Sequence, residues 1–170
     1  MTFARLWDKQ AFLTREYIIA ISAKQGGLCA GQVADRLSNA SDDIGTIFGS
    51  FADHAAGEKL AELLNLKNKS LENIVVLLKN GQSIEAEIEA AHDTNKQIAE
   101  HIASKVEGIK KEALLVHLDS LFAKTVEETK AIVNGQCMNS LTMFETDVLD
   151  AVSSTVGDLM HPLTQHLRKH

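Results

Sequence analysis

The chain has 170 residues, of which 45% are hydrophobic and 5% aromatic, and this length favours a single domain over residues 1–170. Its net charge of -6, with acidic and basic side chains intermixed, excludes the clustered basic face that nucleic-acid binding needs. No apolar run approaches the length of a membrane span. We therefore expect neither nucleic acid nor a membrane as a partner.

Two features of the sequence favour a cytoplasmic location. The N-terminal segment carries charged side chains at intervals, so it lacks the uninterrupted apolar region of a secretory signal. Cys29 and Cys137 lie far apart in the chain and have no metal-ligand spacing. We expect both to be small packing residues in a reducing compartment.

Helical periodicity marks six segments, and the single proline and the low aromatic content favour helix over strand. The first predicted helix covers residues 3–24 and ends before Gly26 and Gly27. The second covers residues 28–51, and we expect it to break near Ser41, where a serine is followed by two aspartates. The other four are predicted over residues 55–79, 83–105, 109–133 and 138–159.

Two of the predicted helices end in the same Asn-Gly-Gln sequence, at residues 80–82 and 134–136. Each is followed at once by another long helix, and such short links make consecutive helices antiparallel neighbours. The sequence therefore predicts an all-α fold, an antiparallel up-down bundle of about five to six helices with a four-helix-bundle core.

Five of the predicted helices each place one polar side chain on the apolar stripe. Counting in steps of three and four along each helix gives Gln10, Lys67, Asn95, His117 and Glu145. The leading interpretation is a buried polar layer that satisfies itself and fixes the helix register. One alternative is that long side chains such as Lys67 reach solvent at the edge of the stripe. The other is that these five residues form a ligand-binding site between the helices.

Two carboxylate and histidine pairs have the three-residue spacing that carboxylate-bridged di-iron bundles use. They are Glu89 with His92 and Asp158 with His161. The spacing places both ligands on one helix face, where they can share a metal ion. Such pairs also arise by chance in a helical chain with 23 acids and seven histidines, and both lack apolar neighbours facing inward. The cofactor therefore stays open, with a metal ion at these residues as the alternative to none.

Several short motifs spread over most of the chain follow the pattern of one group of proteins. They are Leu6-Trp7 with Thr14-Arg15, Arg36-Leu37 with Asp43-Ile44-Gly45, Leu63-Leu64 continuing to Gly81, Asn95 with Ile98-Ala99, and His117-Leu118 before Thr125 and Glu128. On these motifs the chain resembles uncharacterised bacterial helical-bundle proteins of unknown function. The resemblance implies a bacterial origin and an all-α bundle.

The same resemblance implies a partly replaced site. In that group histidines lie where this chain has Gln10 and Lys67, an acid lies at the position of Glu145, and His117 is retained. Inward histidines and acids of this kind are typical of a metal or ligand site, whereas a lysine at neutral pH is a poor metal ligand. The resemblance therefore implies that Lys67 takes the place of a cation and pairs with Glu145 inside the bundle.

Three functional hypotheses follow from the sequence. The first is a non-enzymatic helical bundle whose buried polar layer is structural or binds a small ligand weakly, since no local motif for nucleophilic catalysis or phosphate binding is present. The second is a metal-binding, ferritin-like bundle that uses the acids and histidines named above. The third is a scaffold or adaptor that forms a homo-oligomer through its amphipathic helices.

Overall fold

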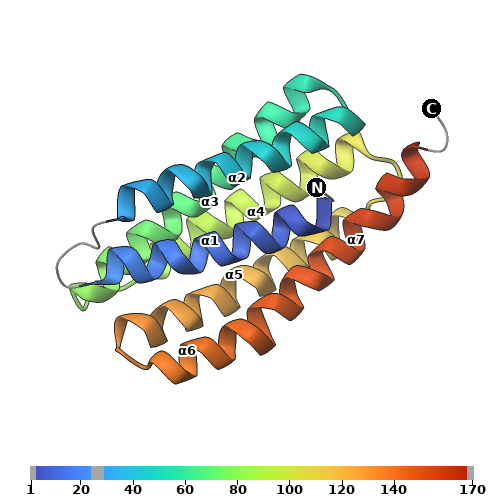
Figure 1. Cartoon of the computed structure of the whole chain (residues 1–170). Helices are drawn as coiled ribbons and strands as arrows, with labels where there is room; N and C mark the ends of the chain where they lie inside the picture. Colours follow the sequence, from blue (N-terminus) through green and yellow to red (C-terminus); the bar gives the residue numbers. More distant parts are fainter. Residues whose placement is uncertain (1–2, 24–28, 168–170) are drawn as a thin grey trace.

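The structure is a computed structural model that describes residues 3–23 and 29–167, and the side chains of all of these except 161 and 164–167. It confirms the all-α antiparallel bundle, and the described residues contain no strand (Figure 1). The elements are α1 Phe3–Ser22, α2 Ala30–Phe51, α3 His54–Lys79, α4 Glu85–Lys105, α5 Lys111–Val133, α6 Cys137–Met143, the π-helical segment η1 Phe144–Val148, and α7 Leu149–Leu167.

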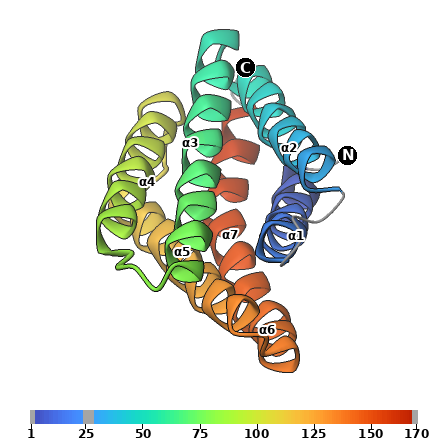
Figure 2. The same cartoon turned by 90° about the vertical axis from the view of Figure 1, so that its left-hand side faces the viewer.

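Four of these helices form the core of the bundle. α1 packs against α3, α5 and α7, and α5 packs against both α3 and α7. α2 and α4 flank this core, and Figure 2 shows them on opposite sides of α3. The four-helix-bundle core predicted from the sequence is therefore made by α1, α3, α5 and α7.

The clearest helix ends are the start of α3, which the sequence analysis did not single out, and the ends of α3 and α5, which it predicted. Asp53 caps α3, because its Oδ1 accepts a hydrogen bond of 2.8 Å from the backbone N–H of Ala56. After α3 and α5 the chain turns at Gly81 and Gly135, whose φ angles of 66° and 73° lie in the left-handed region that glycine adopts readily. The predicted stop at Gly26 and Gly27 lies outside the described residues.

The break predicted in α2 is wrong, because α2 runs without interruption from Ala30 to Phe51. Ser41 is fully buried, and its hydroxyl donates to the carbonyl of Leu37 one turn earlier. The following aspartates, Asp42 and Asp43, lie on the exposed side of the helix. Contacts with neighbouring helices thus outweigh the weak helix propensity of this stretch.

The last predicted helix continues beyond residue 159 and changes its winding. α6, η1 and α7 follow one another without a gap from Cys137 to Leu167, and Pro162 lies inside α7. In η1 the wider π-helical turn shifts the helical phase, so that Phe144 and Val148 face the core. This shift decides where Glu145 points, as described below.

The main core cluster draws apolar side chains from the six long helices. Its members include Leu6, Trp7, Ile44, Phe48, Leu60, Leu64, Ile98, Ile102, Leu114, Leu118, Val152 and Leu159. A smaller cluster lies between α3, α4 and α5 around Ile74, Ala91 and Phe122. Burial of this apolar surface is the main driving force for assembling the bundle.

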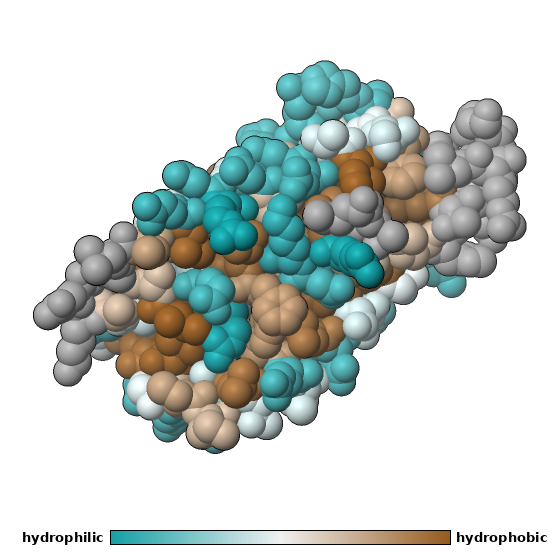
Figure 3. Space-filling view, viewed as in Figure 1, coloured by the Kyte–Doolittle hydropathy of each residue, from teal (hydrophilic) through white to brown (hydrophobic). Residues whose placement is uncertain are grey.

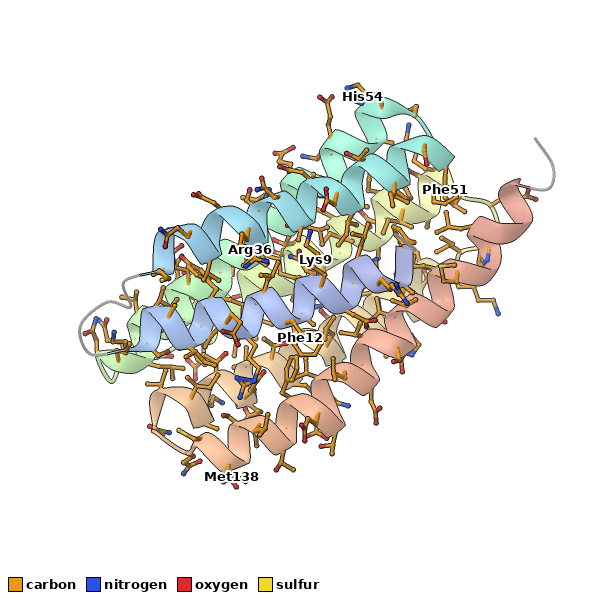
Figure 4. All side chains as sticks on the ribbon, viewed as in Figure 1. Lys9, Phe12, Arg36, Phe51, His54 and Met138 are labelled. Carbon is orange, nitrogen blue, oxygen red and sulfur yellow. The ribbon has the colours of Figure 1, made fainter. Side chains whose placement is uncertain are left out.

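The surface differs between the two sides of α1. Apolar side chains gather over α1 and the neighbouring rod of α6 and α7, whereas α2 presents mainly hydrophilic side chains (Figure 3). Phe12, between α1 and that rod, is 52% exposed, and Met138 on α6 is 75% exposed (Figure 4). Within the described residues, no helix combines the length and the apolarity that crossing a membrane requires.

The two cysteines differ from their predicted role. Cys29 and Cys137 are both exposed and both free, so neither is a packing residue of the core. Cys29 precedes α2 and Cys137 begins α6, which places both at helix ends where side chains meet solvent. Composition and spacing gave no information on this placement.

Candidate functional site

A narrow cavity of about 40 Å³ lies among the helices of the four-helix core, and its wall combines a mainly apolar surface with several polar side chains. α1, α3, α5, η1 and α7 all contribute to its wall. The polar residues that line it are Gln10, Thr14, Arg15, Lys67, Asn68, Thr125 and Glu128, together with the indole of Trp7. A volume of this size has room for about three water molecules at most.

Helical spacing explains why these side chains meet. On α1, Trp7, Gln10 and Thr14 are separated by three and four residues, so they lie on one face of the helix. On α5, Thr125 and Glu128 continue the same face one turn after the buried Leu121. Thr125 bonds the carbonyl of Leu121 with its own hydroxyl at 2.8 Å, so its polar group is satisfied within α5.

An amide and hydroxyl cluster ties three helices together beside the cavity. Gln10 Nε2 donates to Ser41 Oγ and to Asn68 Oδ1, both at 3.3 Å. Asn68 Nδ2 also donates to Ser41 Oγ at 3.3 Å. The carbonyl oxygen of Gln10 is buried and has no hydrogen-bond partner among the described residues. The cluster therefore fixes the Gln10 amide and leaves one acceptor unused.

A buried ion pair joins α1 to α5 at the cavity wall. Arg15 Nε and Glu128 Oε1 are 3.0 Å apart, and their side chains are 13% and 1% exposed. The two atoms lack the alignment of a hydrogen bond. Burial raises the pKa of Glu128 to about 7, although the positive charge of Arg15 acts in the opposite direction. The guanidinium also lies 5.4 Å from the centre of the Phe144 ring, which holds it in place.

Lys67 brings a second positive charge to the cavity. The residue is 8% exposed, and none of the ion pairs between described residues includes it. Burial lowers the pKa of Lys67 to about 8, an effect that the negative charge of Asp119 partly offsets. Asp119 is itself engaged, because His92 Nδ1 and Asn95 Nδ2 lie 2.8 Å and 2.9 Å from its two oxygens.

Trp7 presents an unused donor at the same cavity. The residue is 2% exposed, and its Nε1 has no hydrogen-bond partner among the described residues. A buried indole N–H usually finds a partner, since leaving it unpaired costs free energy. An unpaired donor and the unpaired Gln10 acceptor on one small cavity therefore call for a ligand or ordered water there.

The structure brings together only part of the predicted polar layer. Gln10 and Lys67 line the cavity, as the count along their helices predicted. Asn95 is fully buried but does not line the cavity, because its amide bonds Asp119 between α4 and α5. His117 is half-buried, and its Nδ1 lies 2.6 Å from Asp158 Oδ2 on α7.

The predicted inward position of Glu145 is wrong, and so is its pairing with Lys67. Glu145 is exposed on η1, because the π-helical turn gives the inward position to Phe144. The buried carboxylate at the cavity is Glu128, which pairs with Arg15 and not with Lys67. Counting four residues on from Leu121 to Thr125 and three more to Glu128 would have found this acid in the sequence.

The residues predicted as metal ligands do not gather into a site. Glu89 is exposed, and His92 bonds Asp119 on the surface instead. Asp158 pairs with His117, and the side chain of His161 lies outside the described residues. Among the side chains that the structure describes, no three histidine, cysteine or acidic groups are arranged to hold a metal ion.

A larger and more open groove of about 680 Å³ lies between α4, α5 and the segment where α6 continues into η1. Its apolar floor includes Ile88, Val126 and Met143, and the paired His92 and Asp119 form part of its wall. Phe122 borders both this groove and the polar cavity. The side chain of Phe122 is 5% exposed, so it fills much of the space between the two hollows.

Comparison of the chain with protein-family models, with curated proteins and with solved structures finds no match. The chemistry of the cavity therefore rests on the chain's own residues. They offer one ammonium group without an ion-pair partner, an unused indole N–H, an unused amide oxygen and a neutralised ion pair. These are groups that bind and orient a small polar molecule.

Proposed function

We propose that this chain is a non-enzymatic helical bundle whose central cavity binds a small polar ligand. The observation that carries the proposal is that Trp7 and Gln10 line one cavity and that each has a buried polar atom, Nε1 and Oε1, without a hydrogen-bond partner among the described residues. The cavity also lies within the four-helix core, which is where bundles usually place their ligand sites.

The main alternative is a purely structural polar layer. In such a layer the polar groups satisfy one another, and any space that remains is filled by packing. The cluster of Gln10, Ser41 and Asn68 fits that description. Trp7 Nε1 and Gln10 Oε1 do not, because neither has a hydrogen-bond partner within the described residues. The Lys67 ammonium does not fit it either, because no ion pair between described residues includes it.

Thermal unfolding with a panel of small solutes tests the proposal. The panel contains two neutral molecules, formamide and methanol, two anions, nitrate and formate, and two cations, ammonium and methylammonium. A ligand that binds only the folded chain stabilises it by about 2.7 kcal/mol at one hundred times its dissociation constant. We expect at least one of these solutes to raise the unfolding temperature in a saturable way.

Two matched variants separate the cavity from general solvent effects. Ala11 lines the cavity, so Ala11→Val places two more methyl groups near it and should abolish the saturable shift. Ala20 lies on the same helix outside the cavity, and Ala20→Val should retain the shift. Equal responses of the two variants, or no saturable response in the wild type, would contradict the proposal.

A further inference from the structure

The charges around the cavity do not cancel. Above pH 7, where Glu128 is mostly ionised, Arg15 and Glu128 neutralise each other across 3.0 Å, so the pair contributes little net field. Lys67 is the remaining charged residue on the cavity wall, and it forms no ion pair with a described residue. Asp119 lies farther away and already holds His92 and Asn95. Among the residues that line the cavity, one positive charge is therefore in excess, and the negative charge of Asp119 outside the wall offsets it only in part.

The unpaired polar hydrogens of the residues that line the cavity favour the same kind of ligand as the excess positive charge. The ammonium of Lys67 offers three N–H groups, and the indole of Trp7 offers one that is buried and unused. Donors on a buried wall that also carries a positive charge favour an acceptor with negative charge, since charge-assisted hydrogen bonds are the stronger kind. The volume of about 40 Å³ limits the acceptor to a few atoms.

Resting on the function proposed above, we infer that the ligand is a small monovalent anion, of the size of a halide, nitrate or formate, held between Lys67 and Trp7. One negative charge balances the one positive charge in excess. A cation in the same space would face the ammonium directly, which costs free energy in a low-dielectric interior. Water alone would fill the volume and leave Lys67 without a charged partner in contact, with only the more distant Asp119 to offset its charge.

Two acceptor groups of the cavity, the Glu128 carboxylate and the Gln10 carbonyl oxygen, repel an anion only weakly. Glu128 lies beside the guanidinium of Arg15, which compensates its charge. The Gln10 carbonyl oxygen is neutral, and it can accept from the Lys67 ammonium or from a water beside the anion. Neither acceptor therefore presents an uncompensated negative charge to the anion.

The chain contains a reporter for this site, because Trp7 is its one tryptophan. Iodide is the probe, since its heavy atom quenches indole emission on contact. Collisions with a tryptophan that is 2% exposed give weak quenching that rises linearly with iodide, whereas a bound iodide gives quenching that saturates. Potassium sulfate keeps the ionic strength constant, and nitrate and formate are added as competitors.

The decisive comparison is between two lysines of α3. Lys67→Met should weaken iodide binding by about tenfold or more, because the charge that compensates the anion is removed. Lys69→Met removes the same charge from the exposed side of the helix, where Lys69 pairs with Glu72, and should leave the saturable quenching unchanged. Ala11→Val retains Lys67 and fills part of the cavity, so it should also abolish the saturable quenching by iodide. It therefore tests the site independently of how well Lys67→Met folds.

The outcomes separate the two proposals. Linear quenching that is the same in the wild type and in Lys67→Met, without competition by nitrate or formate, would overturn the anion assignment. If formamide or methanol still raises the unfolding temperature of the wild type and not of Ala11→Val, the cavity is a ligand site of another class. If Ala11→Val changes neither the saturable shift in unfolding temperature nor the saturable quenching for any solute, both proposals fail.

Discussion

Two helix interfaces of this bundle differ in how closely their helices approach each other. Where α2 crosses α3, glycines bring the two backbones into contact, and a Cβ added at Gly45 would lie 2.5 Å from the carbonyl oxygen of Gly57. Where α1, α3, α5 and α7 meet, long polar side chains keep the helices apart and leave a cavity of about 40 Å³.

The difference shows what each interface contributes. Close backbone contact maximises van der Waals attraction and leaves no room for a ligand. The polar cavity retains a charge and two unpaired groups, which lower stability but can bind a small molecule. Stability and binding are therefore placed in neighbouring interfaces that share α3.

The largest expected effect breaks the glycine interface. Gly57→Ala should lower the free energy of unfolding by about 3 kcal/mol, because the new Cβ would overlap the carbonyl oxygen of Gly45 on α2. Gly157→Ala on α7 is the control, since no atom lies near its added Cβ, and it should raise stability by about 0.5 to 1 kcal/mol through helix propensity alone. Urea unfolding measures both, and a gain in stability for Gly57→Ala would contradict the close contact.

The next largest effect breaks the ion pair at the cavity. Arg15→Met should lower the free energy of unfolding at pH 8 by about 2.5 kcal/mol, because Glu128 is left buried without a counter-ion. Adding Glu128→Leu to the same chain should restore most of the loss. Lys9→Met breaks the exposed pair with Asp43 and should cost at most about 1 kcal/mol. Equal losses in Lys9→Met and Arg15→Met would show that Glu128 is solvated.

Removing the excess charge should raise stability. Lys67→Met should increase the free energy of unfolding at pH 7 by about 2 kcal/mol, because the folded chain no longer buries an ammonium group. If Lys67 paired with Glu145 inside the bundle, the same change would instead lower stability by leaving a buried acid without its partner, but Glu145 is exposed. The folded pKa of about 8 lies below the ordinary value of 10.5, so the unfolded chain binds more protons between these values. Wild-type stability should therefore rise over that pH window, and that of Lys67→Met should not.

The smallest effect is the pH dependence due to Glu128. Its pKa of about 7 in the folded chain lies above its ordinary value of 4.5, so the folded state binds the extra proton between these values. The stability that this proton contributes is complete below pH 4.5 and is lost as the pH rises through 7. From pH 6 to pH 7 the wild type should lose about 1 kcal/mol relative to Glu128→Gln. Parallel pH profiles of the two proteins would contradict the burial of this acid.

The sequence predicted the fold well because helical periodicity and helix ends are local signals. The apolar stripe of α3 and the Asn-Gly ends at Gly81 and Gly135 were readable from neighbouring residues alone. The uninterrupted course of α2 was not readable, because it depends on Ser41 meeting Gln10 and Asn68 from other helices. Local propensity carries no information on such partners.

The candidate site was predicted only in part for the same reason. Helical phase places Gln10 and Lys67 on the inner face of their helices, and both line the cavity. Helical phase does not tell at which position along the bundle axis two helices meet, so it grouped His117 with residues of a cavity that His117 does not line. The π-helical turn at η1 also changes the phase, which no regular count can anticipate, and it turned Glu145 outward.

The most direct test of this account is the pKa of Lys67. Two-dimensional NMR of the lysine Cε–Hε groups across pH 6 to 12 follows each ammonium, and the Lys67 signal is identified by its loss in Lys67→Met. We expect Lys67 to titrate with a pKa of about 8, because its ammonium is buried without an ion-pair partner among the described residues. A Lys67 pKa near 10.5 would show a solvated ammonium and contradict the polar cavity as the centre of this molecule's function.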